Sequence, residues 1–443
     1  MTLRALQSPR RVTSFSDRKG AGRVKKETNI VCVGGGPAGL YFAISAKLRN
    51  RNNAITVIER NPAGVTNGWG VGYWDDVLDS LYRNDSVSAR EIQRSTGVWD
   101  GVEVHVGGRR AAYLGGYGLS MGRKRLLDIL AERAADLGVD IQFQREVKDL
   151  SVFPDADLIV ASHGVNSRER QLFANHYQTD VLEGRNKYLW LGTYKVFNAF
   201  RYVFEETPFG WIWLHAYYLD AERSTCIVEC SPETWQGLGI HELEADQSMR
   251  LLEQIFARQL HGHSLINQLR SVDQQLPWHN FKIIRNNIWY RDNVVLIGDA
   301  AHTTHFSIGS GTKLAIGDAI ALAANLDSHD DLQSALRTYD EQRRAEVAPI
   351  QRNAVSSMRW LENVTDFIGQ DSVQFAYALS KRHRPQQPLW RYPLHLATQI
   401  SALRTVRRKL VSVRRWRHAR QRERLADIDQ RPFRSGQRTP IQA

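Results

Sequence analysis

The most constraining feature of this 443-residue chain is a glycine-rich turn between a short apolar strand and a helix. Residues 29–33 are apolar, residues 34–39 read Gly-Gly-Gly-Pro-Ala-Gly, and the residues that follow have helical composition. A second apolar segment, residues 54–58, ends at Glu59, which lies 20 residues beyond Gly39. This order of strand, turn, helix, strand and acid is typical of a βαβ unit that binds a dinucleotide. The sequence therefore predicts an α/β fold built on a parallel sheet.

Each residue type in the turn has a physical role in such a site. Gly34 permits the tight turn, Gly36 lets the backbone approach a pyrophosphate, and Gly39 lets the helix pack closely on the strand. The helix N-terminus then faces the negative charge, although a glycine-rich turn can also be purely structural. Glu59, rather than an arginine, favours an unphosphorylated ribose, hence FAD or NAD over NADP. The predicted dinucleotide site comprises Gly34, Gly36, Pro37, Ala38, Gly39, Glu59 and Arg60.

Composition and charge exclude several classes of protein. The apolar content of 42% and the charged content of 24% are ordinary for a globular protein. No run approaches the roughly 18 apolar residues that a membrane-spanning helix needs. Of the net charge of +12, residues 1–27 carry eight Lys/Arg and two acids, and residues 404–424 carry ten and one, so the remainder has a net charge of −3. We expect no nucleic-acid partner, because a nucleic-acid face would place excess cations within the folded body.

The cysteines and the N-terminal residues indicate the cellular compartment of the protein. Cys32, Cys226 and Cys230 are too few for a disulfide framework, which predicts a reducing cytoplasm. Residues 1–27 lack the apolar core of a secretory signal and are predicted to be a disordered basic leader, with a transit peptide as the alternative. No metal site is predicted.

Two later segments extend the first pattern to a resemblance. Residues 163–170 read His-Gly-Val-Asn-Ser-Arg-Glu-Arg, similar to a D-G-x-x-S-x-x-R segment, and residues 298–302 read Gly-Asp-Ala-Ala-His. In this order the three motifs resemble the FAD-dependent aromatic hydroxylases related to p-hydroxybenzoate hydroxylase, over roughly residues 28–385. Within that family the chain looks most like the salicylyl-CoA and 2-aminobenzoyl-CoA monooxygenases and the tryptophan hydroxylase of violacein biosynthesis. The closer likeness rests on residues 68–71, 120–127, 184–188, 214–217, 227–230 and 305–313.

The resemblance implies a Rossmann-like FAD-binding domain with an inserted, mostly antiparallel sheet as substrate domain and a C-terminal helical region. The residues agree, since residues 187–230 hold β-branched and aromatic runs while residues 312–326 and 332–364 have helical patterns. The predicted domains are residues 28–170, the first part of the FAD-binding domain, with part of the substrate layer near 65–120; 171–285, the antiparallel-sheet substrate domain; 286–330, the second part of the FAD-binding domain; 331–399, C-terminal helices; and 400–443, a basic helix and tail.

The resemblance also implies the reaction. Members of the family use NAD(P)H to reduce FAD and then hydroxylate an electron-rich aromatic ring with O2 through a C4a-hydroperoxyflavin. The subgroup implies a substrate of the anthranilate, salicylate or indole/tryptophan type, free or as a CoA or carrier-protein thioester. We expect a cytoplasmic enzyme, monomeric or homodimeric. The flavin contacts carried over from the family motifs are Arg123, Gly298, Asp299, Gly309, Gly311 and Thr312.

Three residues depart from the family pattern. His163 stands where the family usually has Asp, which bears on how that segment handles FAD or NAD(P)H. Phe306 replaces the usual proline beside the flavin, and Lys313 replaces the usual asparagine, although both resemble the subgroup.

Candidate substrate residues follow these motifs. His215 lies in an aromatic strand and could take a hydrogen bond or proton from a substrate hydroxyl or amine, unless it is a satisfied core histidine. His305 and Ser307 would lie near the flavin, or serve the loop alone. Tyr217 could stack on an aromatic ring. Alternate residues of a strand face opposite sides, so about half of Trp190, Trp211, Trp213, Tyr217 and Tyr218 must be ordinary core or surface.

Other functions remain open at this point. Residues 211–213 read Trp-Ile-Trp, similar to the W-x-W-x-I-P signature of flavin-dependent halogenases, but the Ile-Pro pair is absent. A redox-inactive flavoprotein that binds aromatics or a partner is a second alternative, suggested by His163. Residues 400–413 place apolar residues at helical spacing between arginines. Such a basic helix could meet a carrier protein, CoA phosphates, an anionic membrane or RNA, or could pack on its own domain.

Overall fold

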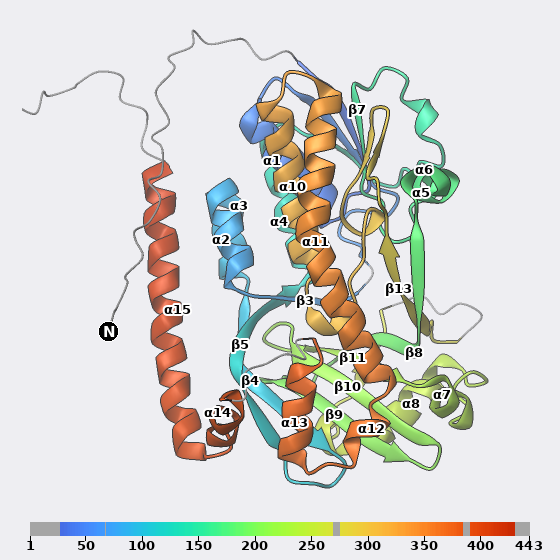
Figure 1. The fold of residues 1–443 in the computed structure, drawn as a ribbon, viewed down its shortest axis with the longest axis vertical. Coiled ribbons are helices and arrows are strands. Elements are labelled where there is room, and N and C mark those ends of the chain that lie inside the picture. Colours follow the sequence, from blue (N-terminus) through green and yellow to red (C-terminus); the bar gives the residue numbers. More distant parts are fainter. Residues whose placement is uncertain (1–26, 67, 269–274, 384–389, 430–443) are drawn as a thin grey trace, which may run out of the picture.

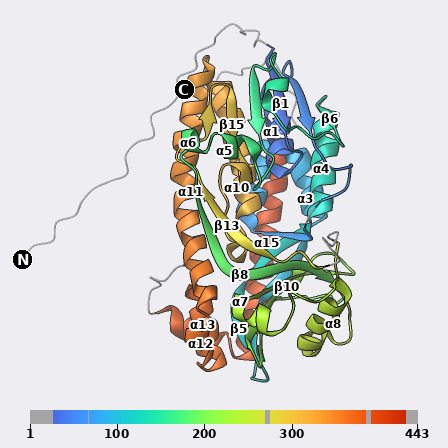
Figure 2. The same ribbon diagram turned by 90° about the vertical axis from the view of Figure 1, so that its right-hand side faces the viewer.

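Two β-sheets lie one beyond the other along the long axis of the molecule, joined by long helices (Figures 1 and 2). The computed structural model describes residues 27–66, 68–268, 275–383 and 390–429. The predicted leader, apart from Glu27, and residues 430–443 of the predicted tail lie outside the described residues. The first sheet has six strands and is mostly parallel, and the second has nine and is mostly antiparallel.

The parallel sheet is built from short apolar strands whose residues are largely buried, as expected for strands covered on both faces. Its strand order is β14-β15-β7-β1-β2-β6, and only the β14–β15 pair is antiparallel among the pairs described. The strands are β1 (Asn29–Val33), β2 (Ala54–Ile58), β6 (Asp140–Gln142), β7 (Leu158–Ala161), β14 (Tyr290–Arg291) and β15 (Val294–Leu296).

The antiparallel sheet interrupts the parallel one in sequence. Its order is β12-β8-β11-β10-β9-β4-β5-β3, with β13 also paired to β8, and β4 pairs with β9 in parallel. The strands are β3 (Gly70–Tyr73), β4 (Gly97–Val106), β5 (Ala112–Gly122), β8 (Asp180–Thr193), β9 (Phe200–Thr207), β10 (Gly210–Tyr218), β11 (Ser224–Cys230), β12 (Leu265–Ile266) and β13 (His279–Arg285).

Helices flank both sheets, and α11 is the longest of those described, running past both (Figure 1). The helices are α1 (Pro37–Arg49), α2 (Asp75–Asn84), α3 (Ser86–Arg94), α4 (Arg123–Asp136), α5 (Arg168–Leu172), α6 (Ala174–Tyr177), α7 (Pro232–Gly237), α8 (Ala245–Ile255), α9 (Ala257–Leu260), α10 (Gly311–Ser328), α11 (Leu332–Glu362), α12 (Thr365–Ile368), α13 (Ser372–Lys381), α14 (Arg391–Ala397) and α15 (Ser401–Asp429). Short 3-10 turns are η1 (Leu150–Val152), η2 (Gly298–Ala300) and η3 (Phe306–Ile308).

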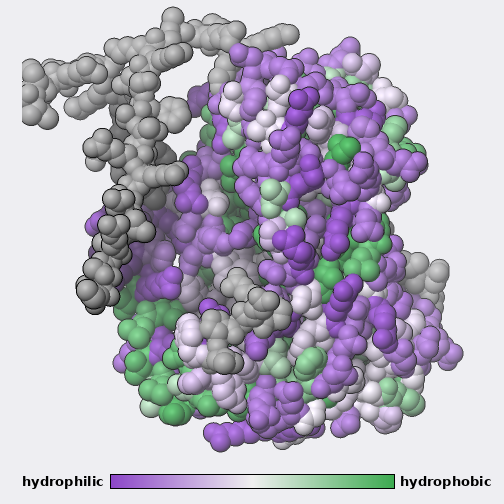
Figure 3. Space-filling model, in the orientation of Figure 1, coloured by the Kyte–Doolittle hydropathy of each residue, from purple (hydrophilic) through white to green (hydrophobic). Residues whose placement is uncertain are grey.

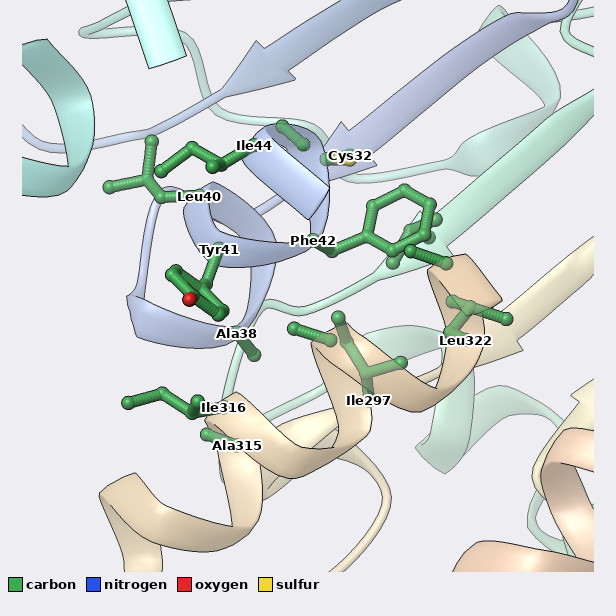
Figure 4. Packing of buried hydrophobic residues seen from close by; sticks show 14 of the residues in the cluster. Cys32, Ala38, Leu40, Tyr41, Phe42, Ile44, Ile297, Ala315, Ile316 and Leu322 are labelled. Carbon is green, nitrogen blue, oxygen red and sulfur yellow. The ribbon is translucent and has the colours of Figure 1, made fainter. Parts of the chain in front are cut away.

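The main core lies where α1 and α10 pack against each other beside the parallel sheet (Figure 4). Small residues allow this close approach. A Cβ at Gly298 would fall 2.9 Å from that of Ala38, and one at Gly39 would fall 2.2 Å from the Gly34 carbonyl oxygen. The two helices therefore begin beside each other, at the carboxyl ends of the strands, which positions both helix N-termini for a shared ligand.

The antiparallel sheet has two chemically different faces. Alternate residues such as Leu214, Cys226 and Val228 point to one side, where they pack with Leu252 of α8 and Leu260 of α9 in an aliphatic core. The intervening residues of β8 to β11 are mostly aromatic or polar and face the other side. The pleat places Trp190, Trp211, Trp213, His215 and Tyr217 on the aromatic side and Tyr218 on the other.

The C-terminal helix α15 contacts the rest of the protein through individual arginines, while most of its basic residues are exposed. Arg404 lies 3.5 Å from the Tyr113 ring centroid, and Arg422 pairs with Asp75 and Asp79. The apolar residues of the helix are exposed, and Figure 3 shows apolar surface gathered at the lower left, where α14 and the first half of α15 lie. These exposed residues are Leu403, Val406, Leu410 and Val413. Among the contacts suggested for this basic helix, the structure shows packing against its own chain.

The fold class predicted from the sequence is confirmed: a Rossmann-like parallel sheet, an inserted and mostly antiparallel sheet, and C-terminal helices. The predicted domain boundaries stay predictions. Among the described residues, no helix is both long and apolar enough to span a membrane.

We predict that Gly39→Ala destabilises the apoprotein by about 1–3 kcal/mol, because the new methyl group would collide with Gly34 and with the Ser162 hydroxyl 2.5 Å away. Thermal unfolding followed by circular dichroism measures this. Gly36→Ala is the matched control, because its Cβ would meet no atom within 4 Å and its φ of −77° suits any residue. Equal melting temperatures for the two variants would contradict the close-packing argument.

Candidate functional site

The glycine-rich turn forms an open cradle at the start of α1. Gly34 has a φ of +115°, and a Cβ there would fall 2.5 Å from the Ser162 carbonyl oxygen, so only glycine fits. Gly36 is open to its surroundings, and no side chain caps α1. Pro37 occupies the first turn and lacks an N–H, so the free donors begin at Ala38. The cradle therefore offers uncapped backbone N–H groups to an anion.

Glu59 is held at the end of β2 by three hydrogen bonds. One carboxylate oxygen accepts the Gly35 N–H at 2.8 Å, and the other accepts the backbone and side-chain N–H groups of Asn61 at 2.8 and 2.7 Å. These bonds fix the carboxylate beside the turn. Arg60 is exposed and close enough to lower the pKa of His163.

A second part of the site is the turn η2 after β15. The Asp299 side chain is exposed to solvent, but many protein atoms surround its carboxyl group. This desolvation raises the pKa of the carboxyl, whereas Arg123 at the start of α4 lowers it. Arg123 donates to the Thr66 hydroxyl at 3.1 Å, and burial lowers its pKa. Arg170 donates to the carbonyls of Asp299 and Ala300. Two guanidinium groups thus surround the Asp299 turn.

The buried carboxylate of Asp318 holds this turn in place. It accepts the Gly298 N–H at 2.8 Å and lies 2.7 Å from His302 Nε2 and 2.8 Å from Arg343 Nε. Burial raises the pKa of Asp318, but its partners outweigh burial and hold it below the ordinary value. His302 of the Gly-Asp-Ala-Ala-His segment therefore acts in the scaffold, tying η2 to α10 and α11.

The N-terminus of α10 completes the cofactor side. Gly309 has a φ of +61°, and a Cβ at Gly311 would meet no atom within 4 Å. Ser310 does not cap the helix, because its hydroxyl donates to Thr304 at 2.9 Å. The N–H groups at the helix start, including that of Thr312, therefore have no side-chain cap. Two uncapped helix N-termini, those of α1 and α10, lie on the same side of the parallel sheet.

His163, the departure from the family Asp, is neutral at physiological pH. Burial lowers its pKa to about 4, helped by Arg170 and Arg60. Its Nε2 lies 3.3 Å from the Ser167 hydroxyl, and its buried Nδ1 has no protein partner. The segment thus presents a neutral ring nitrogen where an aspartate would present a charge.

The aromatic side of the antiparallel sheet carries the candidate substrate residues. We call the aromatic cluster the group Trp99, Tyr188, Trp190, Phe200, Tyr217, Ile227 and Phe306, which pack together from five strands and η3. Tyr217 stacks on Phe200 with ring centroids 5.4 Å apart, and its hydroxyl donates to the Gly70 carbonyl at 3.0 Å. The indole N–H groups of Trp99 and Trp190 are buried without a protein partner.

The other aromatic candidates divide by position. Trp213 packs in a separate cluster with Phe204 and Phe375 under α13, and Trp211 lies at its edge, so both belong to the core. Tyr218 points to the opposite side of β10 from Tyr217. Of the five aromatics, Trp190 and Tyr217 share the cluster.

His215 forms a buried pair with Glu229. Its Nε2 lies 3.3 Å from a Glu229 carboxylate oxygen, although not aligned as a hydrogen bond. That carboxylate also accepts the Asn186 amide at 2.8 Å and the Trp213 indole N–H at 3.0 Å. Burial lowers the pKa of His215 more than Glu229 raises it, while the donors around Glu229 hold its pKa below the ordinary value despite burial. The pair is thus a carboxylate beside a neutral imidazole.

His305 and Ser307 are occupied within their loop. His305 Nδ1 lies 2.7 Å from the Ser307 hydroxyl, which lies 2.7 Å from the Ser357 hydroxyl on α11. The Ser307 carbonyl accepts from buried Arg382, which also donates to the Tyr202 hydroxyl. Burial lowers the pKa of His305 to about 4. This loop connects the cofactor side to the aromatic cluster through Phe306. The catalytic roles of these residues stay predictions.

Two adjoining hollows lie near the edge of the aromatic side, where β4 meets β9. The larger has a volume of about 410 Å³ and the smaller about 40 Å³, and both are lined by Asp100, Glu103 and Arg408. Neither is lined by the glycine-rich turn or by Asp299. Within the described residues, no group of three or more His, Cys, Asp or Glu side chains is placed to hold a metal ion.

The chain matches known proteins over most of its length. A family model described as an FAD binding domain matches residues 154–354. The chain is 36% identical over 372 residues to salicyloyl-CoA 5-hydroxylase of a Streptomyces species, covering 81% of this chain and 71% of that protein. The chain belongs to the FAD-dependent aromatic monooxygenases. FAD is therefore its cofactor, and NAD(P)H is the co-substrate typical of these enzymes.

Two other relatives of this monooxygenase support the same family. It is 34% identical over 337 residues to 3-hydroxy-4-methyl-anthranilyl-(aryl-carrier protein) 5-monooxygenase of Streptosporangium sibiricum, covering 76% of this chain and 90% of that protein. It is 28% identical over 369 residues to protodeoxyviolaceinate monooxygenase of Chromobacterium violaceum, covering 81% and 96%. The family predicted from the sequence is confirmed, and these names do not favour the halogenase and redox-inactive alternatives.

Solved structures share the fold of this monooxygenase. The tetrameric form of 2-methyl-3-hydroxypyridine-5-carboxylic acid oxygenase aligns with a TM-score of 0.61 at 19% identity, covering 81% of this chain and 97% of that one. A probable FAD-dependent monooxygenase from Pseudomonas aeruginosa aligns with a TM-score of 0.59 at 18% identity, covering 80% and 100%.

Sequence reasoning missed four buried charged or hydrogen-bonding residues that organise the site: Glu229, Asp318, Arg343 and Arg382. A signal existed for two of them. Glu229 stands in a strand whose other residues are all buried, and Asp318 stands within an otherwise apolar part of α10. A carboxylate in an apolar run requires buried partners. The two arginines carried no comparable signal, because their partners are distant in sequence.

We predict that Asp318→Asn destabilises the apoprotein by about 3–5 kcal/mol, because it removes the buried carboxylate that pairs with both Arg343 and His302. Urea unfolding followed by tryptophan fluorescence measures the change. Glu346→Gln is the matched control, since Glu346 pairs with the same Arg343 but its side chain is 51% exposed, and we expect it to change stability by less than about 1 kcal/mol. Similar losses in the two variants would contradict the role given to Asp318.

Proposed function

We propose that this monooxygenase hydroxylates an aromatic ring bearing a hydroxyl or amino group, presented as a CoA or carrier-protein thioester. The names of two relatives that are more than 30% identical over most of this chain support this, because one is a salicyloyl-CoA 5-hydroxylase and the other is a 3-hydroxy-4-methyl-anthranilyl-(aryl-carrier protein) 5-monooxygenase. The observation that carries the proposal is the aromatic cluster, which provides flat apolar surfaces beside a neutral histidine. A hydroxyl or amino substituent makes the ring electron-rich enough for oxygen transfer.

We infer that the two helix N-termini and their neighbours hold FAD. The uncapped start of α1, with Gly36, suits the pyrophosphate, and Glu59 suits the ribose hydroxyls. Asp299 and Arg123 would hold the next part of the cofactor, and the uncapped start of α10 would offer N–H donors to its ring system. Bound FAD supplies the redox chemistry with NAD(P)H and O2, and the protein supplies position and polarity.

We infer that His215 accepts the proton of the substrate hydroxyl or amine. A neutral imidazole can do this, and the neighbouring Glu229 carboxylate would stabilise the imidazolium that results. Tyr217 and Phe200 would hold the ring by stacking, because the Tyr217 hydroxyl is already bonded to Gly70. In the described structure His215 is 1% exposed, so proton transfer would take place away from bulk water.

The remaining predictions concern the cellular compartment, the oligomeric state and the size of the substrate. All three cysteines are buried and free, which fits the proposed reducing cytoplasm. We also propose that the enzyme works as a monomer or homodimer on a small aromatic substrate.

A substrate panel tests the proposed function. We expect 2-hydroxybenzoyl-CoA or 2-aminobenzoyl-CoA to stimulate NADH or NADPH oxidation by the FAD-loaded protein and to gain one oxygen atom from labelled O2, detected by mass spectrometry. The matched free acids should react more slowly, and tryptophan is the indole control. Hydroxylation of a free acid or of tryptophan at the rate of the thioesters, or no hydroxylated thioester at all, would refute the proposed substrate class.

The pH profile of kcat/KM tests His215. Its neutral form is the active one, so activity should fall as pH drops through its pKa, which burial places below the ordinary 6.5. Glu229→Gln removes the carboxylate that raises this pKa, so the acidic limb should move to lower pH. His215→Gln should lower kcat by about 100-fold and abolish the limb. An unchanged limb in both variants, with FAD still bound, would contradict the role of the pair.

A further inference from the structure

The two hollows near β4 and β9 form one charged site, which we call the basic hollow. The first half of α15 forms one wall, and the β4–β5 hairpin forms the opposite wall; the same helix lies beside β5 in Figure 1. Residues of the loop between β8 and β9, including Lys195, close a third side. The residues from α15 are Arg404, Arg407, Arg408 and Val411.

Cations outnumber carboxylates in the basic hollow. Five basic side chains line it against two carboxylates, Asp100 and Glu103. Glu103 is already neutralised, because Arg201 lies 2.9 Å from it and His105 lies 3.3 Å from it. Within the described structure, no ion pair involves the other four basic side chains. These four are Lys195, Arg404, Arg407 and Arg408.

The local packing draws these cations together. The Arg407 guanidinium lies over Gly115, where a Cβ would fall 1.9 Å from its Cζ atom, so a larger residue at that position would expel it. Arg404 lies on the Tyr113 ring. Arg404 is partly buried, whereas Arg407 and Arg408 line the hollow with side chains that remain exposed to solvent. Clustered like charges repel one another, so this arrangement favours a bound anion with several negative oxygens.

The basic hollow adjoins the aromatic cluster. Val102 lines the hollow and also packs on the cluster. Trp99 of the cluster directly precedes Asp100 of the hollow, and Phe200 of the cluster directly follows Ala199 of the hollow. A molecule with an aromatic ring at one end and phosphates at the other could therefore occupy both.

We propose that the basic hollow binds the phosphate group of the phosphopantetheine arm of an aryl thioester. This inference rests on the proposed thioester substrate and adds where the arm is recognised. The arm is common to CoA and to a carrier protein, so both sources share this chemistry. Arginine binds phosphate through two parallel hydrogen bonds, which suits Arg407 and Arg408 at the mouth of the hollow.

Titration calorimetry on the FAD-loaded full chain tests the proposal without an aromatic ring. We expect CoA and 4′-phosphopantetheine to bind, and pantetheine, which has no phosphate, to bind at least about tenfold more weakly. Affinity for CoA that exceeds affinity for phosphopantetheine would identify CoA as the source, and equal affinities would identify the shared arm. Equal binding of pantetheine and CoA, or no binding of either phosphorylated probe, would overturn the proposal.

Charge reversal localises the site. Arg408→Glu and Lys195→Glu, which line the hollow from α15 and from the loop between β8 and β9, should each weaken CoA binding by about tenfold. Lys409→Glu is the matched control, because Lys409 is the next residue on the same exposed helix but lines neither hollow, and it should change binding by less than about threefold. An equal loss in Lys409→Glu would show attraction to the whole helix and would overturn the site. FAD content confirms that each variant is folded.

Turnover separates this inference from the proposed function. With 2-hydroxybenzoyl-CoA or 2-aminobenzoyl-CoA as substrate, Arg408→Glu should raise KM and leave kcat unchanged, because the arm contributes binding and not chemistry. Phosphate-dependent CoA binding without turnover of either thioester would support the hollow and refute the proposed function. Turnover of a thioester with an unchanged KM in Arg408→Glu and Lys195→Glu would refute the hollow and leave the function standing.

Discussion

The buried carboxylate of Asp318 is the interaction on which the cofactor side depends. From α10 it joins the backbone of Gly298 and the imidazole of His302, both in the segment 298–302, to the guanidinium of Arg343 on α11. Because a buried charge is tolerated only with such partners, the carboxylate constrains η2, α10 and α11 together. Asp299 lies next to Gly298, so its position follows from the same constraint.

A second buried carboxylate, Glu229, has the corresponding role on the antiparallel sheet. Its donors are Asn186, Trp213 and, less well aligned, His215, so a charge is held among residues from three adjacent strands. The result is a rigid polar position inside an otherwise aromatic and apolar surface. The loop that contains Phe306 then links this surface to the cofactor side. One buried carboxylate, on α10, therefore organises the cofactor side, and another, on β11, organises the aromatic side of the antiparallel sheet.

The C-terminal helix α15 packs on the protein through cations and not through an apolar face. An amphipathic helix usually buries its apolar side, yet α15 turns Arg404, Arg415 and Arg422 toward Tyr113, Tyr117 and the acidic residues of α2. Cation–π contacts and ion pairs thus replace apolar burial along this helix. This choice of side places three arginines along a hollow next to the aromatic cluster, and it leaves apolar residues exposed.

The sequence by itself determined the βαβ unit and a site for FAD or NAD, because these depend on local patterns: glycines where a side chain would collide, and Glu59 at the end of the second strand. The resemblance of the three ordered motifs then implied FAD and the family. Alternation along β10 also predicted that only some aromatics share a surface. The partners of Glu229 and Asp318, the loop bonds that occupy Ser307 and the side that α15 presents were decided by the tertiary structure. Each of these depends on contacts between segments far apart in sequence, which no local pattern records.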